Sequence, residues 1–552
     1  MRRSGIHRWL AALFALALLA GACGGDDGGT DEVGAGDTET DGDTGDAPVP
    51  EEGEGEPQPG GTLIVAATSD GDTLDPHASA SFNVHNRVGL ASSRLLKPDL
   101  SAEYEYGEAP LTGDLAEEWE VSDDLLTYTF HLRDDVVWHD MAPVNGRPFV
   151  ADDVVATFER ILDEGFQAYM LENVTSIEAP DEHTVVITLS QPFAPLLNYM
   201  GNHHMWIMPR EGVEGEYDVS TQVIGTGPFM LTEWDRGVTT VYEKNPDYFE
   251  EGVPYLDGVE MPVVPDQGAR TAAFRAGETH IITAVNPEET ASLLAAVPDA
   301  RHLQYIGTAP LIMYVNMEQE PFNDLRVRRA MSMAVDREGL GDALYGSGHY
   351  TGPVNAHVKA FALPEDELAE LMPYDVEAAK QLLADAGYPD GFSTTLMTTA
   401  GYGPRIVNGA EWVVEDLAAI GIDAEIEVVD YATYIGQRWA NVEYEMAVGL
   451  QTPFQEADEW LRAQHHSDGS RNWWNINDPE LDTMLDEQAA TVDEDERISL
   501  IQDIQRYIVE EVSNPMQLWI GDTEIILGPT VRNYLSQPQY GTNHYAYVWL
   551  EE

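Results

Sequence analysis

The chain has 552 residues, too many for one small hydrophobic core, so two or three lobes are expected. Its hydrophobic content of 43% is ordinary for a globular protein, but 98 acidic against 28 basic residues give a formal net charge of −70. This charge excludes a general nucleic-acid binder, whose surface must attract phosphate. An acidic surface with only four lysines is typical of salt adaptation or simply of solubility, and it favours neutral or cationic ligands over polyanions.

The N-terminus has the pattern of an export signal. It begins with the basic residues Arg2, Arg3 and Arg8. An apolar stretch over 9–19 follows and is shorter than a membrane-spanning helix requires. Small residues at 20–22 then precede Cys23, the single cysteine, in a pattern that resembles a bacterial lipobox. We predict a signal peptide over 1–22 and lipidation of Cys23; the alternative is a plain secretory signal with an incidental cysteine.

Residues 24–59 are low-complexity, built mainly of Gly, Asp, Glu, Thr and Pro without a basic residue. Such a segment cannot bury enough apolar surface to offset the entropy lost on ordering. We therefore predict that residues 23–59 form a lipid-anchored, acidic and disordered tether to a folded body that begins at Gly60.

Two segments in the first half of the folded body predict β-structure. G-T-L-I-V-A over 61–66 indicates a strand, with T-L-D-P-H over 73–77 as the turn after it. Tyr128, Phe130 and Leu132 alternate with polar residues, as in a half-buried strand.

A helix is expected to begin near Asp152. We expect Asp152 to cap it and Val155, Phe158 and Leu162 to form its apolar face. Asp152 and Asp153 could be mistaken for a catalytic carboxylate pair, but helix capping explains them more simply.

The segment N-H-H-M-W over 202–206 invites interpretation as a metal site. Adjacent side chains on a strand point to opposite faces, so His203 and His204 cannot both serve one site if this segment is a strand. No third ligand lies nearby at metal spacing. We therefore expect no metal here.

The segment 224–249 predicts a rigid hairpin preceded by a glycine turn. Gly225, Gly227 and Pro228 form the turn. Alternating residues over 229–234 and the run 238–243 read as its two strands. By its residues alone it is an ordinary surface hairpin.

The second half of the chain is richer in helix signals. Residues 270–277 lead into the motif G-E-T-H over 277–280, and a short strand that holds Thr283 is expected after it. In P-F-N-D-L-R-V-R-R-A over 321–330, Asn323 or Asp324 is expected to cap a helix whose buried stripe is Val327, Met331, Ala334 and Val335. Its arginines are expected on a solvated face.

Residues 374–429 form an α/β unit in which helix and strand patterns alternate. The loop 400–404 follows the carboxyl end of the strand 392–399 and precedes a helix. Open α/β sheets bind ligands at such positions. Tyr402 is therefore our best single aromatic contact, although a loop tyrosine is as often mere packing.

Several of these motifs resemble one family in the same order. G-T-G-P-F over 225–229 followed by N-P-D-Y-F over 245–249 is similar to the signature of family 5 extracellular solute-binding proteins, which serve peptide, dipeptide and nickel ABC transporters. The openings at 60–66 and 73–77, the stretch 113–155, and P-F-N-D-L-R resemble it as well. The chain departs from the pattern at His280, where the family's G-E-x-D has Asp, and in its longer loop over 141–147.

The resemblance implies an α/β, two-lobed periplasmic-binding-protein fold of the large cluster C type, with an extra subdomain in the first lobe. The chain is then expected to cross between lobes near Gly307 and near Pro515. The expected division is lobe I over 60–105, 222–307 and 515–552, the extra subdomain over 106–221, and lobe II over 308–514.

The resemblance also implies a lipid-anchored receptor at the outer face of the cell membrane or in the periplasmic space. It would capture a solute between its lobes and deliver it to ABC transporter permease subunits, as a monomer, without a cofactor, metal, nucleic acid or chemistry on the solute. The chain has no Walker A lysine, so ATP hydrolysis must come from a partner. A sensory receptor is an alternative, and an exported hydrolase finds no catalytic constellation.

We favour a short peptide as the solute, with an oligosaccharide or a nickel chelate as alternatives. The expected ligand-binding residues are Phe82, Thr283, Tyr402, Tyr431, Arg438, Gln451, Thr452, Trp460 and Trp473. Arg438 is expected to pair with a terminal carboxylate. Peptide binders of the family commonly place an Asp in this region for the α-ammonium, but 451–455 has none, so Glu456 or Asp458 would have to replace it.

Overall fold

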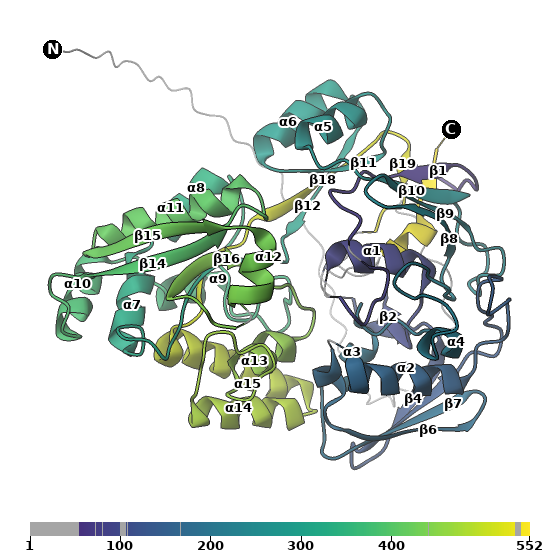
Figure 1. The fold of residues 1–552 in the computed structure, drawn as a ribbon, viewed down its shortest axis with the longest axis horizontal. Helices are drawn as coiled ribbons and strands as arrows, with labels where there is room; N and C mark the ends of the chain where they lie inside the picture. The colour runs from purple at the N-terminus through teal and green to yellow at the C-terminus, as the bar shows by residue number, and fades with distance from the viewer. Residues whose placement is uncertain are drawn as a thin grey trace, which may run out of the picture. The chain divides into compact units, whose positions relative to one another are not determined.

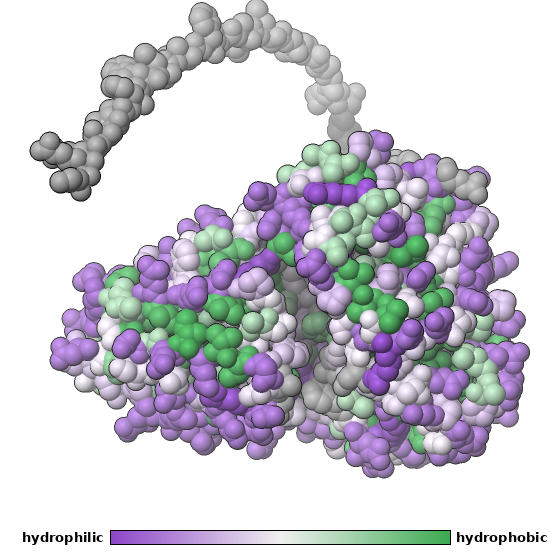
Figure 2. Space-filling model, turned by 45° about the horizontal axis from the view of Figure 1, so that its top comes forward, coloured by the Kyte–Doolittle hydropathy of each residue, from purple (hydrophilic) through white to green (hydrophobic). Residues whose placement is uncertain are grey.

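The computed structural model describes residues 55–551, except 72, 80, 100–105, 107–108, 166, 440 and 536–541 (Figure 1). The described residues belong to one compact unit, 44–552. The predicted signal peptide, Cys23 and most of the predicted tether lie outside the described residues. Figure 2 shows many hydrophilic residues on the face in view, as the charge of −70 implies, together with several apolar patches.

A four-stranded sheet contains the predicted first strand and the predicted hairpin. Its order is β1 (Thr62–Ile64), β10 (Gly258–Pro262), β9 (Thr239–Lys244) and β8 (Phe229–Asp235). Two glycines let the turn before β8 approach α1 (Phe82–Ala91). A Cβ atom at Gly225 would lie 1.8 Å from the carbonyl oxygen of Ala91, and one at Gly227 would lie 2.5 Å from the carbonyl carbon of Ala91. Close backbone approach therefore explains the glycines of G-T-G-P-F.

An antiparallel sheet of order β4 (Ala116–Val121), β5 (Thr127–Leu132), β7 (Thr184–Leu189) and β6 (Val174–Asp181) holds the alternating strand. Helix α2 (Ala151–Glu164) packs on β6 and β7 (Figure 1). The prediction that Asp152 caps this helix is wrong, because the N-cap residue is Val150. Asp153, not Asp152, accepts from the amide of Val150 at 3.2 Å. Asp153 is buried and bound by Arg147 and Trp138, while Asp152 is exposed.

A three-stranded antiparallel sheet has the order β11 (Ile281–Ala284), β18 (Asp522–Leu527) and β12 (Arg301–Ile306). Helices α5 (Gln267–Arg275) and α6 (Pro287–Ala296) lie beside β11 (Figure 1). This sheet joins segments more than 200 residues apart in the sequence.

A five-stranded sheet contains the predicted α/β unit. Its order is β15 (Ile422–Val429), β14 (Phe392–Thr399), β16 (Met446–Leu450), β13 (Leu311–Val315) and β17 (Met516–Trp519). Strands β14 and β15 are parallel and joined through α11 (Pro404–Ala418), as the α/β pattern predicts. The helices that pack with this sheet or with one another beside it include α7 (Leu325–Ala334), α8 (Arg337–Leu344) and α10 (Val376–Asp385).

Helix α7 is capped by Asp324, which accepts from the amide of Arg326 at 2.9 Å, and its predicted buried stripe is fully buried. The solvated arginine face is only partly correct. Arg328 is buried and donates to the carbonyl oxygens of Val512 and Phe322, because α7 packs beside the helical turn Ile508–Val512.

Buried aromatic and aliphatic residues also pack together among α13 (Ala457–His465), α14 (Pro479–Ala490) and α15 (Glu494–Tyr507). The remaining elements are β2 (Leu96–Pro98), β3 (Leu111–Gly113), α3 (Leu196–Met200), α4 (Arg210–Val213), α9 (Glu365–Leu371), α12 (Tyr431–Thr433), β19 (Val531–Arg532), β20 (Trp549–Leu550), and the 3-10 or π turns Ala168–Leu171, Tyr434–Trp439, Ile508–Val512 and Thr542–Tyr547.

The chain passes between the three-stranded and five-stranded sheets at two places that lie against each other. One is the link 307–310 from β12 to β13, and the other is the link 520–521 from β17 to β18. The amide of Gly307 donates to the carbonyl oxygen of Gly521 at 3.2 Å. The second passage comes after the predicted position near Pro515, because residues 516–519 still pair with β13.

Candidate functional site

The start of α13 carries three buried acids, Glu456, Asp458 and Glu459, which we call the carboxylate cluster. Each is exposed by 3% or less. Four of their partners, Tyr169, Asn198, Tyr199 and Asn202, lie more than 250 positions earlier in the chain. Such a contact between distant segments makes this region the first candidate for the functional site.

Except for Arg497, the side chains that donate to the cluster are neutral. The Tyr199 hydroxyl donates to Asp458 Oδ2 at 2.9 Å, and the Tyr169 hydroxyl donates to Glu459 Oε1 at 2.7 Å. Asn202 Nδ2 donates to Glu459 Oε2 at 3.1 Å. Asn198 Nδ2 and the ion-paired Arg497 both donate to Glu456, and Gln488 donates to Asp458.

These bonds correct the hypothesis that Glu456 or Asp458 neutralises a peptide's α-ammonium. Both acids are already occupied within the chain, and Glu456 also caps α13 by accepting from the amide of Asp458 at 3.2 Å. Burial raises the pKa of Asp458 to about 6 and that of Glu459 to about 7. The cluster therefore joins two distant parts of the chain in a pH-sensitive way.

Arg471 lies next to the cluster and was not predicted from the sequence. It is 3% exposed, and its guanidinium carbon lies 5.5 Å from the ring centre of Tyr169, 4.8 Å from that of Phe454 and 5.9 Å from that of Trp473. Stacked cation–π contacts of this kind hold an arginine in a fixed orientation. The run R-N-W-W at 471–474 was the sequence signal for it.

The histidines of N-H-H-M-W meet in a way that the strand argument missed. Residues 201–204 form turns rather than a strand, so both side chains reach the same place. The ring centres of His203 and His204 are 4.1 Å apart, and His204 stacks on His85 at 4.5 Å. Burial lowers the pKa of His85 to about 4 and those of the other two well below their usual value. These three histidines are therefore neutral near pH 7.

Within the described ranges, no group of three or more His, Cys, Asp or Glu side chains is placed to hold a metal ion. In the same part of the chain, no helix combines the length and apolar character that crossing a bilayer requires.

The predicted aromatic contacts divide into two kinds. Tyr402 is half-buried and meets Tyr431 edge-on at 5.1 Å, and the Tyr431 side chain is 47% exposed. Trp473 is half-buried and lies 4.4 Å from Trp439. Trp460 is completely buried, and its indole nitrogen donates to the carbonyl oxygen of Phe454 at 3.1 Å. In this structure Trp460 is therefore part of the core, and its role as a ligand contact stays a prediction.

The predicted polar contacts also have partners inside the chain. Arg438 forms an ion pair with Glu427 at 2.6 Å and donates to the carbonyl oxygen of Glu443 at 2.9 Å. Gln451 is buried and donates to Gln464 Oε1 at 2.9 Å. Thr452 is half-buried, and Phe82, the first residue of α1, is 36% exposed.

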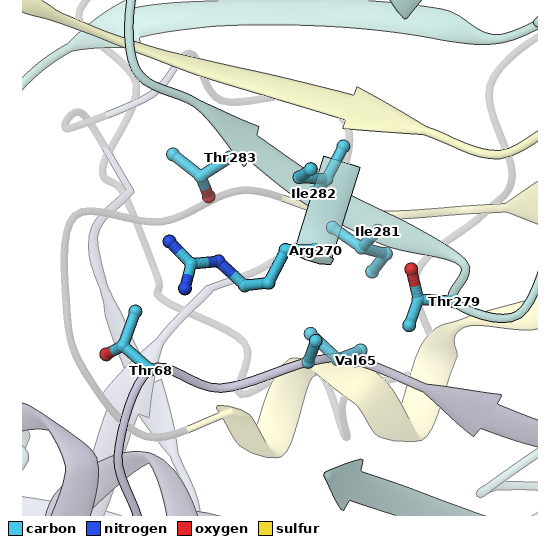
Figure 3. Close-up of a pocket in the computed structure, with 8 residues that line it drawn as sticks. Val65, Thr68, Arg270, Thr279, Ile281, Ile282 and Thr283 are labelled. Carbon is cyan, nitrogen blue, oxygen red and sulfur yellow. The ribbon is translucent and has the colours of Figure 1, made fainter. Parts of the chain in front are cut away.

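Thr283 lies elsewhere, on β11, and lines a pocket of about 130 Å³ (Figure 3). The other lining residues are Val65, Ala66, Thr68, Arg270, Thr279, Ile281 and Ile282. Figure 3 shows the guanidinium of Arg270 between the side chains of Thr68 and Thr283. The sequence indicated Thr283 but gave no reason to select Arg270, which looked like an ordinary helix residue.

Comparisons with known proteins agree on one family. Residues 110–472 match the family described as "Bacterial extracellular solute-binding proteins, family 5 Middle". Heme-binding protein A of Haemophilus influenzae is 28% identical over 511 residues, which cover 86% of this chain and 87% of the relative. Di/tripeptide-binding protein 1 of Pseudomonas aeruginosa is 29% identical over 445 residues, which cover 74% and 81%.

A solved structure is similar over most of the chain. The periplasmic binding protein DppA from Helicobacter pylori, in complex with the peptide STSA, is 27% identical with a TM-score of 0.77. The match covers 90% of this chain and 99% of DppA. This likeness confirms the predicted α/β fold of a periplasmic binding protein of the cluster C type.

Proposed function

Because the chain belongs to the family 5 bacterial extracellular solute-binding proteins, we propose that it captures a short peptide between two lobes and hands it to an ABC transporter permease. The family is one of non-enzymatic solute-binding proteins, so the chain is an ABC transporter substrate-binding protein that leaves its solute chemically unchanged. The family match supports substrate binding for an ABC transporter, and the choice of a peptide as the substrate is our proposal.

The observation that best supports a peptide is the likeness to DppA. It extends over 90% of the chain, and the solved protein holds the four-residue peptide STSA. A relative named for di- and tripeptides is similar over 74% of the chain. The exposed face of Tyr431 beside Tyr402 supports the same class, because flat aromatic walls bury apolar side chains without demanding one sequence.

A second candidate, a neutral oligosaccharide, is favoured by one observation. Glu456 and Asp458 are bound within the chain and Arg438 is paired with Glu427, so the charges predicted for the two peptide termini are engaged. A sugar would use the same aromatic walls without a charged partner. A nickel chelate or a sensory role are further alternatives.

The cellular setting is part of the same proposal. Residues 1–22 would be removed as a signal peptide, Cys23 would carry the lipid, and 23–59 would tether the body to the outer face of the membrane. The lobes would follow the predicted division, with the second crossing at 520–521 in place of Pro515. The lobes would close on the solute by a hinge motion at the two crossings.

A thermal-shift screen of the purified body tests this proposal. A ligand that binds only the folded state raises the melting temperature by mass action. We expect short peptides to raise it and oligosaccharides or nickel chelates to leave it unchanged. Stabilisation by an oligosaccharide alone would transfer the assignment to the second candidate, and turnover of any compound that is lost on mutating a cleft residue would contradict the family function.

A further inference from the structure

The pocket beside Thr283 is too small for a whole solute. Ligand pockets that enclose a drug-sized molecule are roughly 300–1,000 Å³, whereas this one is about 130 Å³. It fits one end group of a larger molecule. Its walls combine the aliphatic residues Val65, Ile281 and Ile282 with the hydroxyls of three threonines.

Arg270 is the only charged residue among those that line this pocket. Its guanidinium donates to the carbonyl oxygens of Val264 at 2.6 Å and Pro265 at 2.8 Å and to the amide oxygen of Gln267. Within the described part of the chain, no carboxylate forms an ion pair with it. These partners are neutral oxygens, so they orient the guanidinium without pairing it directly with a carboxylate.

The nearest acids are committed to other groups. Glu289 accepts from Thr271, Gln267 and the amide of Val285, and Asp266 caps α5 through the amide of Ala269. Both remain close enough to act on Arg270 electrostatically, but neither contacts it. Their hydrogen bonds hold them on the helices.

A second arginine reaches the same end of β11. Arg405, at the start of α11, donates to the carbonyl oxygen of Val285, two residues after Thr283. Its guanidinium also lies 4.6 Å from the ring centre of Tyr345. It brings another positive charge to this region from the part of the chain that carries Tyr402.

A group that fits a positive charge and several hydroxyl donors is a planar anion with two acceptor oxygens. An ammonium group would be repelled by Arg270, and a neutral amide would gain less from it. We propose that the pocket binds a carboxylate at one end of the solute, with Arg270 and Thr283 as the residues that select it. This inference rests on the proposed function and replaces Arg438 as the partner of the acidic end.

The test compares an acid with its amide at two levels. A peptide from the screen is titrated as its free acid and as its C-terminal amide, and propionate and propionamide are compared by saturation-transfer NMR. In the parent protein we expect the acid of each pair to bind roughly tenfold or more tightly, as for a hydrogen bond to a charged group. Arg270→Gln and Thr283→Val should lose most of this preference, and Arg270→Lys should keep part of it.

Arg275→Gln is the matched control, because Arg275 lies on the same helix, is exposed and bonds only Ser292 among the described contacts. It should keep the full preference. An unchanged preference in both Arg270→Gln and Thr283→Val, or no preference in the parent, would overturn the pocket assignment. Propionate binding that depends on Arg270 in a protein that binds no peptide would keep the pocket and refute the peptide proposal. Thr283→Val leaves every hydrogen bond of Arg270 in place. It therefore tests the pocket even if Arg270→Gln fails to fold.

Discussion

The carboxylate cluster of α13 and the pocket beside Thr283 are both polar, but they use their charges differently. Every acid of the cluster meets donors elsewhere in the chain, and Glu456 has the full counter-charge of Arg497. Arg270 in the pocket meets only carbonyl and amide oxygens. A buried charge that the chain itself neutralises holds the structure together. Arg270 is half-buried and directly bonds no carboxylate among the described residues, so its guanidinium can recognise a ligand.

The same contrast separates the two tryptophans that the sequence predicted as walls of the site. Trp460 lies in the core with no exposed surface, and Trp473 is half-buried beside Arg471. Position relative to the core, and not residue type, decides which of them a solute can touch.

The largest effect is expected from Trp460→Ala. Removing a fully buried tryptophan leaves a cavity and should lower the free energy of unfolding by about 3–5 kcal/mol. Trp473→Ala should cost clearly less, because part of its ring already faces solvent. Urea unfolding of both variants measures the difference. Equal losses would show that the two side chains are not divided into core and surface as described.

The next effect concerns pH. The pKa values of Asp458 and Glu459 are raised, to about 6 and about 7, so the folded protein favours their protonated forms. Their contribution to the free energy of unfolding is fully present below about pH 4, near the ordinary pKa values of free carboxyls. It is lost as the pH rises through 6 and 7. The loss amounts to a few kcal/mol at about 1.4 kcal/mol per pKa unit.

Burial also raises the pKa values of Asp114 and Asp416, so the parent must be compared with a variant. In Asp458→Asn/Glu459→Gln, the unfolding free energy should fall less between pH 4.5 and pH 7.5 than in the parent. Urea titrations at the two pH values measure this. Identical pH dependence in the two proteins would mean that the cluster does not carry the raised pKa values.

The smallest effect is expected from Tyr199→Phe, which removes one donor to the buried Asp458. A buried acceptor left without its donor costs about 1–3 kcal/mol. Tyr374→Phe is the control, since the Tyr374 side chain is 54% exposed. The midpoint of thermal unfolding should be lower for Tyr199→Phe than for Tyr374→Phe. Equal midpoints would show that the Tyr199 hydroxyl does not stabilise the contact with Asp458.

Much of the fold could be predicted because its signals are local. The glycine turn at Gly225 and Gly227, the hairpin after it and the strand–helix–strand unit around α11 depend on neighbours in the sequence, and all are present. The prediction for the start of α2 was wrong by only a few residues. Asp152 does not cap α2, because the N-cap is Val150 and its amide donates to Asp153. Arg147 and Trp138 also bind Asp153, and sequence spacing does not show such partners.

The candidate site was less predictable because its contacts are long-range. Asp458 meets Tyr199 across 259 positions of the chain, so nothing near Asp458 indicates that it is occupied. His203 and His204 were separated by a strand argument that fails because the backbone turns there. Arg270 gained its role only when β11 and the segment after β1 came together around it.

We propose that the chain binds a peptide without altering it. Isothermal titration of the purified body with a short free-acid peptide, followed by mass spectrometry of the recovered peptide, tests this most directly. We expect saturable binding at one site per chain and recovery of the intact peptide. Absence of binding by every peptide in a library that covers lengths from two to five residues, or recovery of cleaved peptide, would contradict it.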